Sequence, residues 1–268
     1  MKIIKPALLK EGDTIGILAP SGPMEDDTNL LRAIKFFENK GYNIKLSDNV
    51  YKKNKYLAGT DEERLNALHN MFADKSVNAI ICLRGGYGAI RLINKINYDL
   101  IRENPKIFCG YSDITALNAM FLKRAGLMTY SGPMILSDFG QEDLCEFTIN
   151  KFFETVCKDK FDYEGTFWGG NLSTLVSLCG QDFIPDFEFT LFLEDLNEPL
   201  YKIDKMVTQL FNIEKIRKNT KAIAIGDFLD CESVDYIFEE FNLPLIKNFP
   251  ASHSAKKATI PYGLKCKK

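Results

Sequence analysis

Short apolar segments alternate with helical patterns along the first half of the chain. Five segments have the length and composition of buried strands, at residues 14–19, 43–46, 79–83, 107–110 and 127–130. Between them, apolar residues recur every three or four positions, as they do on the core-facing side of a helix. Strands that alternate with helices in this way predict an α/β domain with a parallel, doubly wound sheet.

Capping residues mark the ends of two of these helices. Thr60 and Glu63 have the spacing of a capping box, so a helix is expected to begin here, with Leu65 and Phe72 on its inner face. Gly41 follows an earlier run of helical spacing and fits a glycine cap at a helix C-terminus.

The pattern changes after a helix that is predicted at residues 141–156. Charged residues cluster at 158–164, and the glycine-rich sequence GTFWGGN follows at 165–171. We therefore place a domain boundary here, which divides the chain into residues 1–160 and residues 161–268.

The second domain is predicted to be the smaller one and to contain short strands. Apolar runs indicate strands at residues 191–193 and 222–225, and a last pair of short strands is expected to flank residues 249–261. Its clearest helix covers residues 200–211, where apolar side chains share one face.

The fourth predicted strand ends in a turn that carries a serine. In the sequence IFCGYSDITAL, the apolar run ends at Gly110, Ser112 and Asp113 follow, and a helical pattern begins at once. A strand–turn–helix of this kind exposes a hydroxyl and places the next N–H groups at a helix N-terminus, where they stabilise negative charge. Ser112 is therefore either a nucleophile or a helix N-cap.

The chain has only two histidines, which limits the choice of a general base. His69 falls inside the predicted capped helix and is interpreted as structural, whereas His253 lies in a loop of turn residues before a strand. A serine nucleophile needs a base, so His253 is the candidate partner of Ser112.

The histidine of such a site needs a carboxylate to orient it. Glu194 and Asp195 follow an apolar run in the second domain, and Glu194 is preferred because neighbouring side chains on a strand point to opposite faces. Asp113 is too close to Ser112 in sequence to reach the far side of the histidine.

Two backbone amides are candidates for an oxyanion hole. One is the N–H of Asp113, and the other is a glycine N–H in Gly85-Gly86, after the third predicted strand. A tight turn is the alternative reason for the two glycines. The lipase motif G-x-S-x-G is absent, because Ile114 stands where it requires glycine.

Charge and composition exclude several classes of function. The net charge is -2 and no long cluster of basic residues precedes the final 265–268, so binding to nucleic acid is not expected. No apolar run approaches about 18 residues, and the N-terminal sequence MKIIKPALLKEGD lacks the core of a signal peptide. A soluble, cytoplasmic protein without a membrane partner is expected.

Cysteine and glycine patterns argue against metals and cofactors. The seven cysteines are scattered and form no C-x-x-C pair, unlike those of a zinc site or a disulfide framework. The dinucleotide fingerprint G-x-G-x-x-G is absent from the first predicted strand-to-helix turn. We therefore expect neither a metal nor a cofactor.

Several motifs in order resemble those of a known family. The sequences DTIGILAPSGP, LRGGYGAIRL, GYSDITALN, GGNL, FLEDLNEPLYKIDKMVTQL and FPASHSAKKATIPYG span nearly the whole chain. Together they resemble the LD-carboxypeptidase family of serine peptidases, which includes muramoyl-tetrapeptide carboxypeptidases and microcin C immunity-type peptidases. Ser252 stands where the family commonly has glycine before its histidine.

The resemblance implies a Ser-His-Glu triad of Ser112, His253 and Glu194, with an oxyanion hole at the amides of Gly86 and Asp113. It implies a flavodoxin-like N-terminal domain, a small β-rich C-terminal domain, a site between them and a homodimer. The reaction it implies is hydrolysis of the amide that joins the L-centre of a diamino acid to a terminal D-alanine, during cytoplasmic recycling of peptidoglycan peptides. The implied substrate is a small peptide such as murein tetrapeptide.

Two residues are candidate substrate contacts. Arg84 precedes the glycine turn and is suited to bind the terminal carboxylate of the peptide, because a guanidinium matches that group bidentately. A structural ion pair with an acidic residue is the alternative. Trp168 is the only tryptophan, and it is either a stacking residue for a nucleotide or a core residue at the domain boundary.

Two other functions remain open at this point. A microcin C-type peptidase would cleave an aminoacyl-nucleotide amide, but the segment between Ser112 and GGNL is shorter than in that group, which favours the murein peptide. A non-catalytic ligand-binding protein would keep the fold without the reaction. The presence of all three catalytic residue types argues against it.

Overall fold

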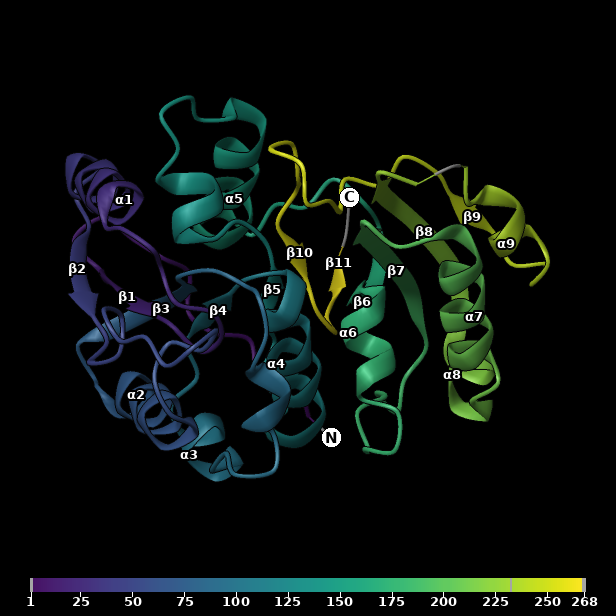
Figure 1. Ribbon diagram of the computed structural model, residues 1–268, viewed down its shortest axis with the longest axis horizontal. Coiled ribbons are helices and arrows are strands. Elements are labelled where there is room, and N and C mark those ends of the chain that lie inside the picture. The colour runs from purple at the N-terminus through teal and green to yellow at the C-terminus, as the bar shows by residue number, and fades with distance from the viewer. Residues whose placement is uncertain (1, 232, 267–268) are drawn as a thin grey trace.

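Two sheets flanked by helices lie side by side in the molecule (Figure 1). The computed structural model describes residues 2–231 and 233–266. Within these residues, the first sheet has six strands in the order β10-β5-β4-β3-β1-β2. Their bounds are β1 Thr14–Leu18, β2 Asn43–Leu46, β3 Val77–Cys82, β4 Ile107–Cys109, β5 Tyr130–Ser131 and β10 Ile260–Pro261.

The strands of the first domain run parallel, in the order β2-β1-β3-β4-β5. This is the order of a flavodoxin-like sheet, so the predicted fold class is confirmed. The strand order reverses between β1 and β3, and sheets of this kind bind ligands at such a point, beyond the carboxyl ends of the strands. Gly85 and Gly86 follow β3 and Ser112 follows β4, so both candidate segments lie at this edge.

Helices cover both faces of the first sheet (Figure 1). α2 begins after Thr60, whose hydroxyl accepts the N–H of Glu63 while the Glu63 carboxylate accepts the N–H of Thr60, so the predicted capping box is present. The helices are α1 Thr28–Asn39, α2 Asp61–Ala73, α3 Tyr98–Glu103, α4 Thr115–Met120 and α5 Glu146–Lys158, with the shorter helical turns η1 Ala89–Arg91, η2 Ser112–Ile114, η3 Phe121–Ala125 and η4 Ile135–Phe139.

Two elements of this domain differ from their predicted bounds. β5 is shorter than the predicted strand because Met128 donates its N–H to the carbonyl of Ile4 (2.9 Å), so this segment pairs with the N-terminal residues first. α5 begins at Glu146 rather than at Gln141. Gln141 instead closes the turn after η4, with its N–H donated to the Asp138 carbonyl (3.3 Å).

The second sheet has the order β11-β6-β7-β8-β9 in the described residues, and β6 to β9 run parallel. Helix α7 has the predicted bounds and buries Ile203, Val207 and Leu210 on one face. The strands are β6 Gly165–Asn171, β7 Phe189–Leu196, β8 Thr220–Leu229, β9 Leu245–Ile246 and β11 Lys265–Cys266, and the helices are α6 Leu172–Ser177, α7 Leu200–Phe211, α8 Glu214–Asn219 and α9 Asp235–Glu239.

The sequence did not predict β6, because its glycines are typical of a loop. Gly169 and Gly170 have φ of +152° and +125°, and a Cβ at Gly169 would lie 1.9 Å from the carbonyl oxygen of Phe192 on β7. Glycine is therefore required where β6 approaches its neighbour closely. The glycine-rich segment at 165–171 is thus a strand that lies between β11 and β7.

The C-terminal segment contributes to both sheets. β10 pairs antiparallel with β5, and β11 pairs antiparallel with β6 a few residues later, so this segment runs between the two sheets (Figure 1). The division at residues 160 and 161 remains a prediction. Residues 260–266, however, pair with strands of both sheets.

The apolar core is continuous between the two sheets. One cluster packs beneath α1 and α5, and a second fills the other face of the first sheet and continues from Leu117 on α4 to Leu172 on α6.

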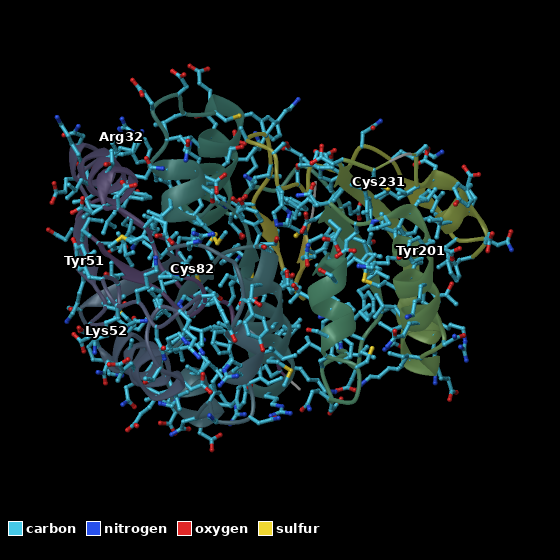
Figure 2. The ribbon with its side chains drawn as sticks, in the orientation of Figure 1. Arg32, Tyr51, Lys52, Cys82, Tyr201 and Cys231 are labelled. Carbon is cyan, nitrogen blue, oxygen red and sulfur yellow. The ribbon has the colours of Figure 1, made fainter. Side chains whose placement is uncertain are left out.

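Cys82, at the end of β3, lies inside the first domain (Figure 2), and burial raises the pKa of its thiol well above the usual range. No helix within residues 2–231 and 233–266 is long and apolar enough to cross a membrane.

Candidate active site

Ser112 occupies a strained turn between β4 and α4. Its φ is +63°, a left-handed conformation that costs a residue other than glycine about 1–2 kcal/mol. Its side chain caps neither η2 nor α4. The interpretation of Ser112 as a helix cap is therefore wrong, and strain at a strand-to-helix turn is typical of a nucleophile.

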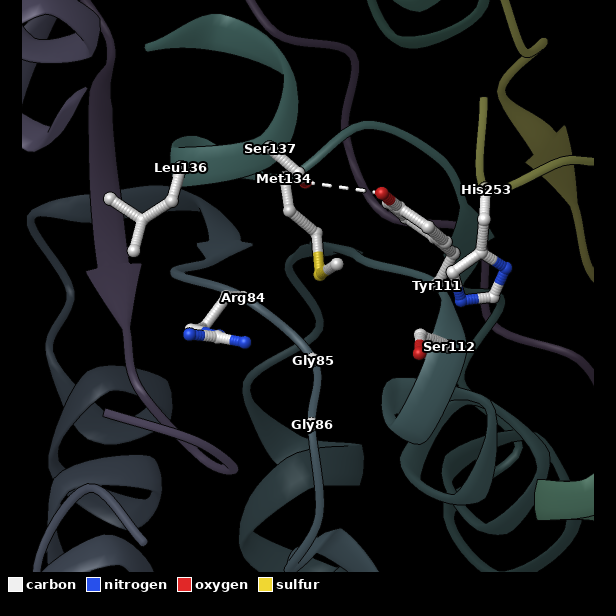
Figure 3. A pocket seen from close by; sticks show the side chains of 9 residues that line it. All are labelled: Arg84, Gly85, Gly86, Tyr111, Ser112, Met134, Leu136, Ser137 and His253. Atoms are coloured by element: carbon white, nitrogen blue, oxygen red, sulfur yellow. Dashed lines mark hydrogen bonds between the residues drawn. The ribbon is translucent and has the colours of Figure 1, made fainter. Parts of the chain in front are cut away.

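A pocket of about 290 Å³ opens above this turn (Figure 3). It lies at the carboxyl ends of β3 and β4, and the loop before β10 reaches it from the second half of the chain. Its lining residues are Arg84, Gly85, Gly86, Tyr111, Ser112, Met134, Leu136, Ser137 and His253. The structure thus brings together residues that are 141 positions apart in sequence, since 253 - 112 = 141.

The Glu194 carboxylate contacts the imidazole ring of His253. Nδ1 of the imidazole lies 2.5 Å from Oε2 of Glu194, which is 3% exposed on β7. Burial raises the pKa of the Glu194 carboxyl, and the contact with His253 opposes that shift. This contact favours the tautomer with its proton on Nδ1, which leaves Nε2 able to accept one.

Nε2 of His253 is buried and has no hydrogen-bond partner among the described residues. The imidazole lies on the Ser112 side of the pocket, and its ring meets Tyr111 edge-on at 5.0 Å between centroids (Figure 3). Within the residues that the structure describes, no hydrogen bond joins Ser112 to His253. Hydrogen bonds between catalytic residues are often long when no substrate is bound.

Asp195, the alternative carboxylate, points away from His253. It accepts hydrogen bonds from the Asn171 side chain (2.9 Å) and from the N–H of Ser173 (2.8 Å). The side chains of these two neighbouring acidic residues of β7 thus point to opposite faces of the sheet.

The Gly85–Gly86 turn lies against Ser112. The Gly85 carbonyl accepts the N–H of Gly22 (3.1 Å). In a trans peptide the carbonyl and the following N–H point in opposite directions, so the N–H of Gly86 points away from Gly22. A Cβ at Gly85 would lie 2.9 Å from Cβ of Ser112 and 3.0 Å from its Oγ. The glycine therefore does more than make a turn, because it lets this backbone approach the serine.

The Asp113 side chain ties the loops of the site together, a role that sequence reasoning missed. Its carboxylate is buried and accepts the Ser21 hydroxyl (2.5 Å) and the N–H of Ala89 (2.8 Å). Burial raises the pKa of this carboxyl, and the two hydrogen bonds oppose the shift. The turns after β1, β3 and β4 are thereby held to one another, with the Asp113 amide beside Ser112.

A buried ion pair behind the pocket was also missed. Lys257, four residues after His253, pairs with Asp138 of η4, and each side chain is 3% exposed. The Lys257 ammonium lies 4.7 Å from the centre of the Tyr111 ring, and Tyr111 donates its hydroxyl to Ser137 (3.1 Å). Charged residues rarely lie in a core, so nothing in the sequence signals this pair.

The two candidate substrate contacts lie in different places. Arg84 lines the pocket, donates one hydrogen bond to the Pro23 carbonyl (3.2 Å) and has no acidic partner among the described residues. Trp168 is fully buried on β6, with ring centroids 5.8 Å from Phe183 and 4.9 Å from Phe189. The structure does not bring Trp168 to the pocket.

No cluster of three or more potential metal ligands occurs within residues 2–231 and 233–266. His69, the other histidine, accepts the N–H of Asn97 at Nε2 (3.0 Å).

Two family descriptions match the chain. The LD-carboxypeptidase N-terminal domain matches residues 15–132, and the LD-carboxypeptidase C-terminal domain matches residues 164–267. A probable murein peptide carboxypeptidase of Bacillus subtilis (strain 168) is 35% identical over 289 residues, which cover 97% of this chain and 90% of the relative.

Solved structures share the fold. A muramoyltetrapeptide carboxypeptidase from Oxalobacter formigenes has a TM-score of 0.83 and 33% identity, covering 93% of this chain and 92% of that one. The microcin C7 self-immunity protein MccF, in complex with adenosine monophosphate, has a TM-score of 0.89 at 24% identity, and the match covers 98% of this chain and 94% of that one. Both family domains match in order and the identity extends along nearly the whole chain, so the chain belongs to the LD-carboxypeptidase family of serine-type peptidases.

Proposed function

We propose that the protein is a cytoplasmic carboxypeptidase that releases the terminal D-alanine of murein tetrapeptide. The observation that carries this proposal is the strained Ser112 turn, which shares one pocket with a histidine oriented by a buried glutamate. The similarity to murein peptide carboxypeptidases supports this substrate class. The scattered cysteines, without a C-x-x-C pair, fit a reducing compartment.

The proposed reaction proceeds through an acyl-enzyme. Oγ of Ser112 attacks the carbonyl carbon of the diamino acid while Nε2 of His253 takes its proton, and Glu194 stabilises the imidazolium. The amides of Gly86 and Asp113 stabilise the oxyanion. His253 then gives its proton to the amine of the departing D-alanine, and a water molecule hydrolyses the ester by the reverse sequence.

The substrate assignment is tested by offering two substrates to the same protein. Murein tetrapeptide is expected to lose D-alanine, whereas an amide-linked aminoacyl nucleotide is expected to be cleaved far more slowly. The buried position of Trp168 supports this order, because that ring is not available to stack on a base. Faster cleavage of the nucleotide in a competition assay would reverse the assignment.

Arg84 is proposed to bind the carboxylate of the terminal D-alanine. Its guanidinium lines the pocket and has no acidic partner among the described residues, so it is available to an incoming carboxylate. Arg84→Lys is expected to raise KM about tenfold, because an ammonium does not reproduce the bidentate contact. An unchanged KM for D-alanine release would argue against this role.

A further inference from the structure

A second groove, of about 790 Å³, adjoins the catalytic pocket. Arg84 and Gly86 line both spaces, and the groove then continues over Tyr87 to Lys53, Lys55 and Tyr56. Neither Ser112 nor His253 lines the groove. It is therefore an extension of the site that starts at Gly86 and Arg84 and leads away from Ser112 and His253.

The position of His253 decides which part of a substrate the groove can receive. In a serine hydrolase the histidine protonates the leaving amine, so the leaving group must lie next to that histidine. The acyl part of the peptide then extends to the other side of Ser112, past the Gly86 amide. Arg84, proposed to bind the D-alanine carboxylate, lies where the two spaces meet, so the part of the groove beyond it, from Tyr87 to Lys55, is on the acyl side.

The groove carries more positive than negative charge. Lys53, Lys55 and Arg84 are its cations, and Glu25 is its only acidic lining residue. Glu25 pairs with Lys53 (2.6 Å), whereas Lys55 has no acidic partner in the described part of the chain. With Arg84 assigned to the D-alanine carboxylate and Lys53 paired with Glu25, Lys55 is the groove cation that remains to pair with an anionic ligand.

Lys55 and Tyr56 lie at the tip of a tight turn. Asn54 and Leu57 exchange two backbone hydrogen bonds, of 2.8 and 3.0 Å, around them. The following residue, Ala58, donates its N–H to the Ser21 carbonyl (2.9 Å), which attaches this turn to the loop after β1. The backbone that carries the two side chains is therefore held in place before any ligand binds, which lowers the entropy cost of binding.

Two tyrosine rings form an exposed aromatic surface beside these lysines. Tyr56 is 60% exposed and Tyr87 is 46% exposed, and their rings meet edge-to-face with centroids 5.7 Å apart. Aromatic rings that remain exposed next to cations at a site are suited to contact the apolar parts of a ligand.

We propose that this groove binds the acyl-side portion of an acidic peptide, with Lys55 pairing with a free carboxylate that precedes the diamino acid. The tyrosine pair contacts the aliphatic part of the same segment. This inference rests on the proposed function for the direction in which the peptide lies. It adds a specificity-determining site for a charge remote from the bond that is cleaved.

The test compares murein tetrapeptide with the same peptide in which the acyl-side carboxylate is converted to an amide. The wild-type protein is expected to prefer the free acid in kcat/KM by about tenfold, as one charge-assisted contact provides. Lys55→Gln is expected to abolish this preference. The matched control Lys52→Gln is expected to keep it, because Lys52 pairs with Glu63 and lies on the outer side of the domain (Figure 2).

The same comparison by calorimetric binding to Ser112→Ala protein separates the two proposals. If the wild-type protein released no D-alanine while the Ser112→Ala protein still bound the free acid more tightly in a Lys55-dependent manner, the proposed function would fail and the groove assignment would stand. If turnover occurred but Lys55→Gln kept the full preference for the acid, the groove assignment would be overturned.

Discussion

Replacing Ser112 with alanine is expected to lower kcat for D-alanine release by roughly 10⁶-fold, the size of effect seen when a serine nucleophile is removed. The reason is that Tyr111, the neighbouring residue with a hydroxyl, donates that hydroxyl to Ser137, so Ser112 carries the hydroxyl of the strained turn that is left to react. Release of D-alanine from murein tetrapeptide, followed by chromatography, measures the loss. The fold is expected to be retained, because alanine is smaller than serine and can adopt the same backbone conformation.

The matched control is Ser137→Ala, which removes a hydroxyl from the same pocket but not from the turn. It is expected to retain most of the activity. A fluorophosphonate probe should label wild-type protein at Ser112 and leave Ser112→Ala unlabelled. Undiminished release of D-alanine by Ser112→Ala would refute the assignment, and a folded wild-type protein inert to both substrate and probe would favour a ligand-binding role.

Lys257→Met is expected to lower the free energy of unfolding by about 3–5 kcal/mol, the usual cost of removing one partner of a buried ion pair. The change leaves the Asp138 carboxylate buried without its cation, although Ser137 and the Met134 amide still donate to it. Urea denaturation followed by circular dichroism measures the loss. Adding Asp138→Asn is expected to recover much of it, because a neutral amide needs no counterion.

The exposed neighbour Lys256 supplies the control. Lys256→Met makes the same chemical change one residue earlier in the His253 loop and is expected to alter the free energy of unfolding by no more than about 0.5 kcal/mol. Equal losses for the two variants would show that the ion pair contributes nothing specific. The pair joins the His253 loop to η4 of the first domain, so its loss should also reduce activity in protein that remains folded.

Local rules account for the elements that the sequence predicted correctly. The capping box at Thr60 and the amphipathic face of α7 depend on residues a few positions apart, and both are found where expected. Periodicity also distinguished Glu194 from Asp195, since alternation along a strand sends the two side chains to opposite faces. By contrast, β6 was not predicted, because its glycines are required by close contact with β7 and not by any local preference for a strand.

The sequence by itself thus determined the alternation of strands and helices in the first domain, the serine turn and the small set of candidate residues to act with it. These features depend on short-range periodicity and on residue chemistry. Only the tertiary structure decided that Lys257 meets Asp138, that Trp168 lies in the core and that the Lys55 turn lines a groove beside Gly86. Those outcomes depend on which distant segments pack together, and side chains far apart in the chain carry no local signal of their partners.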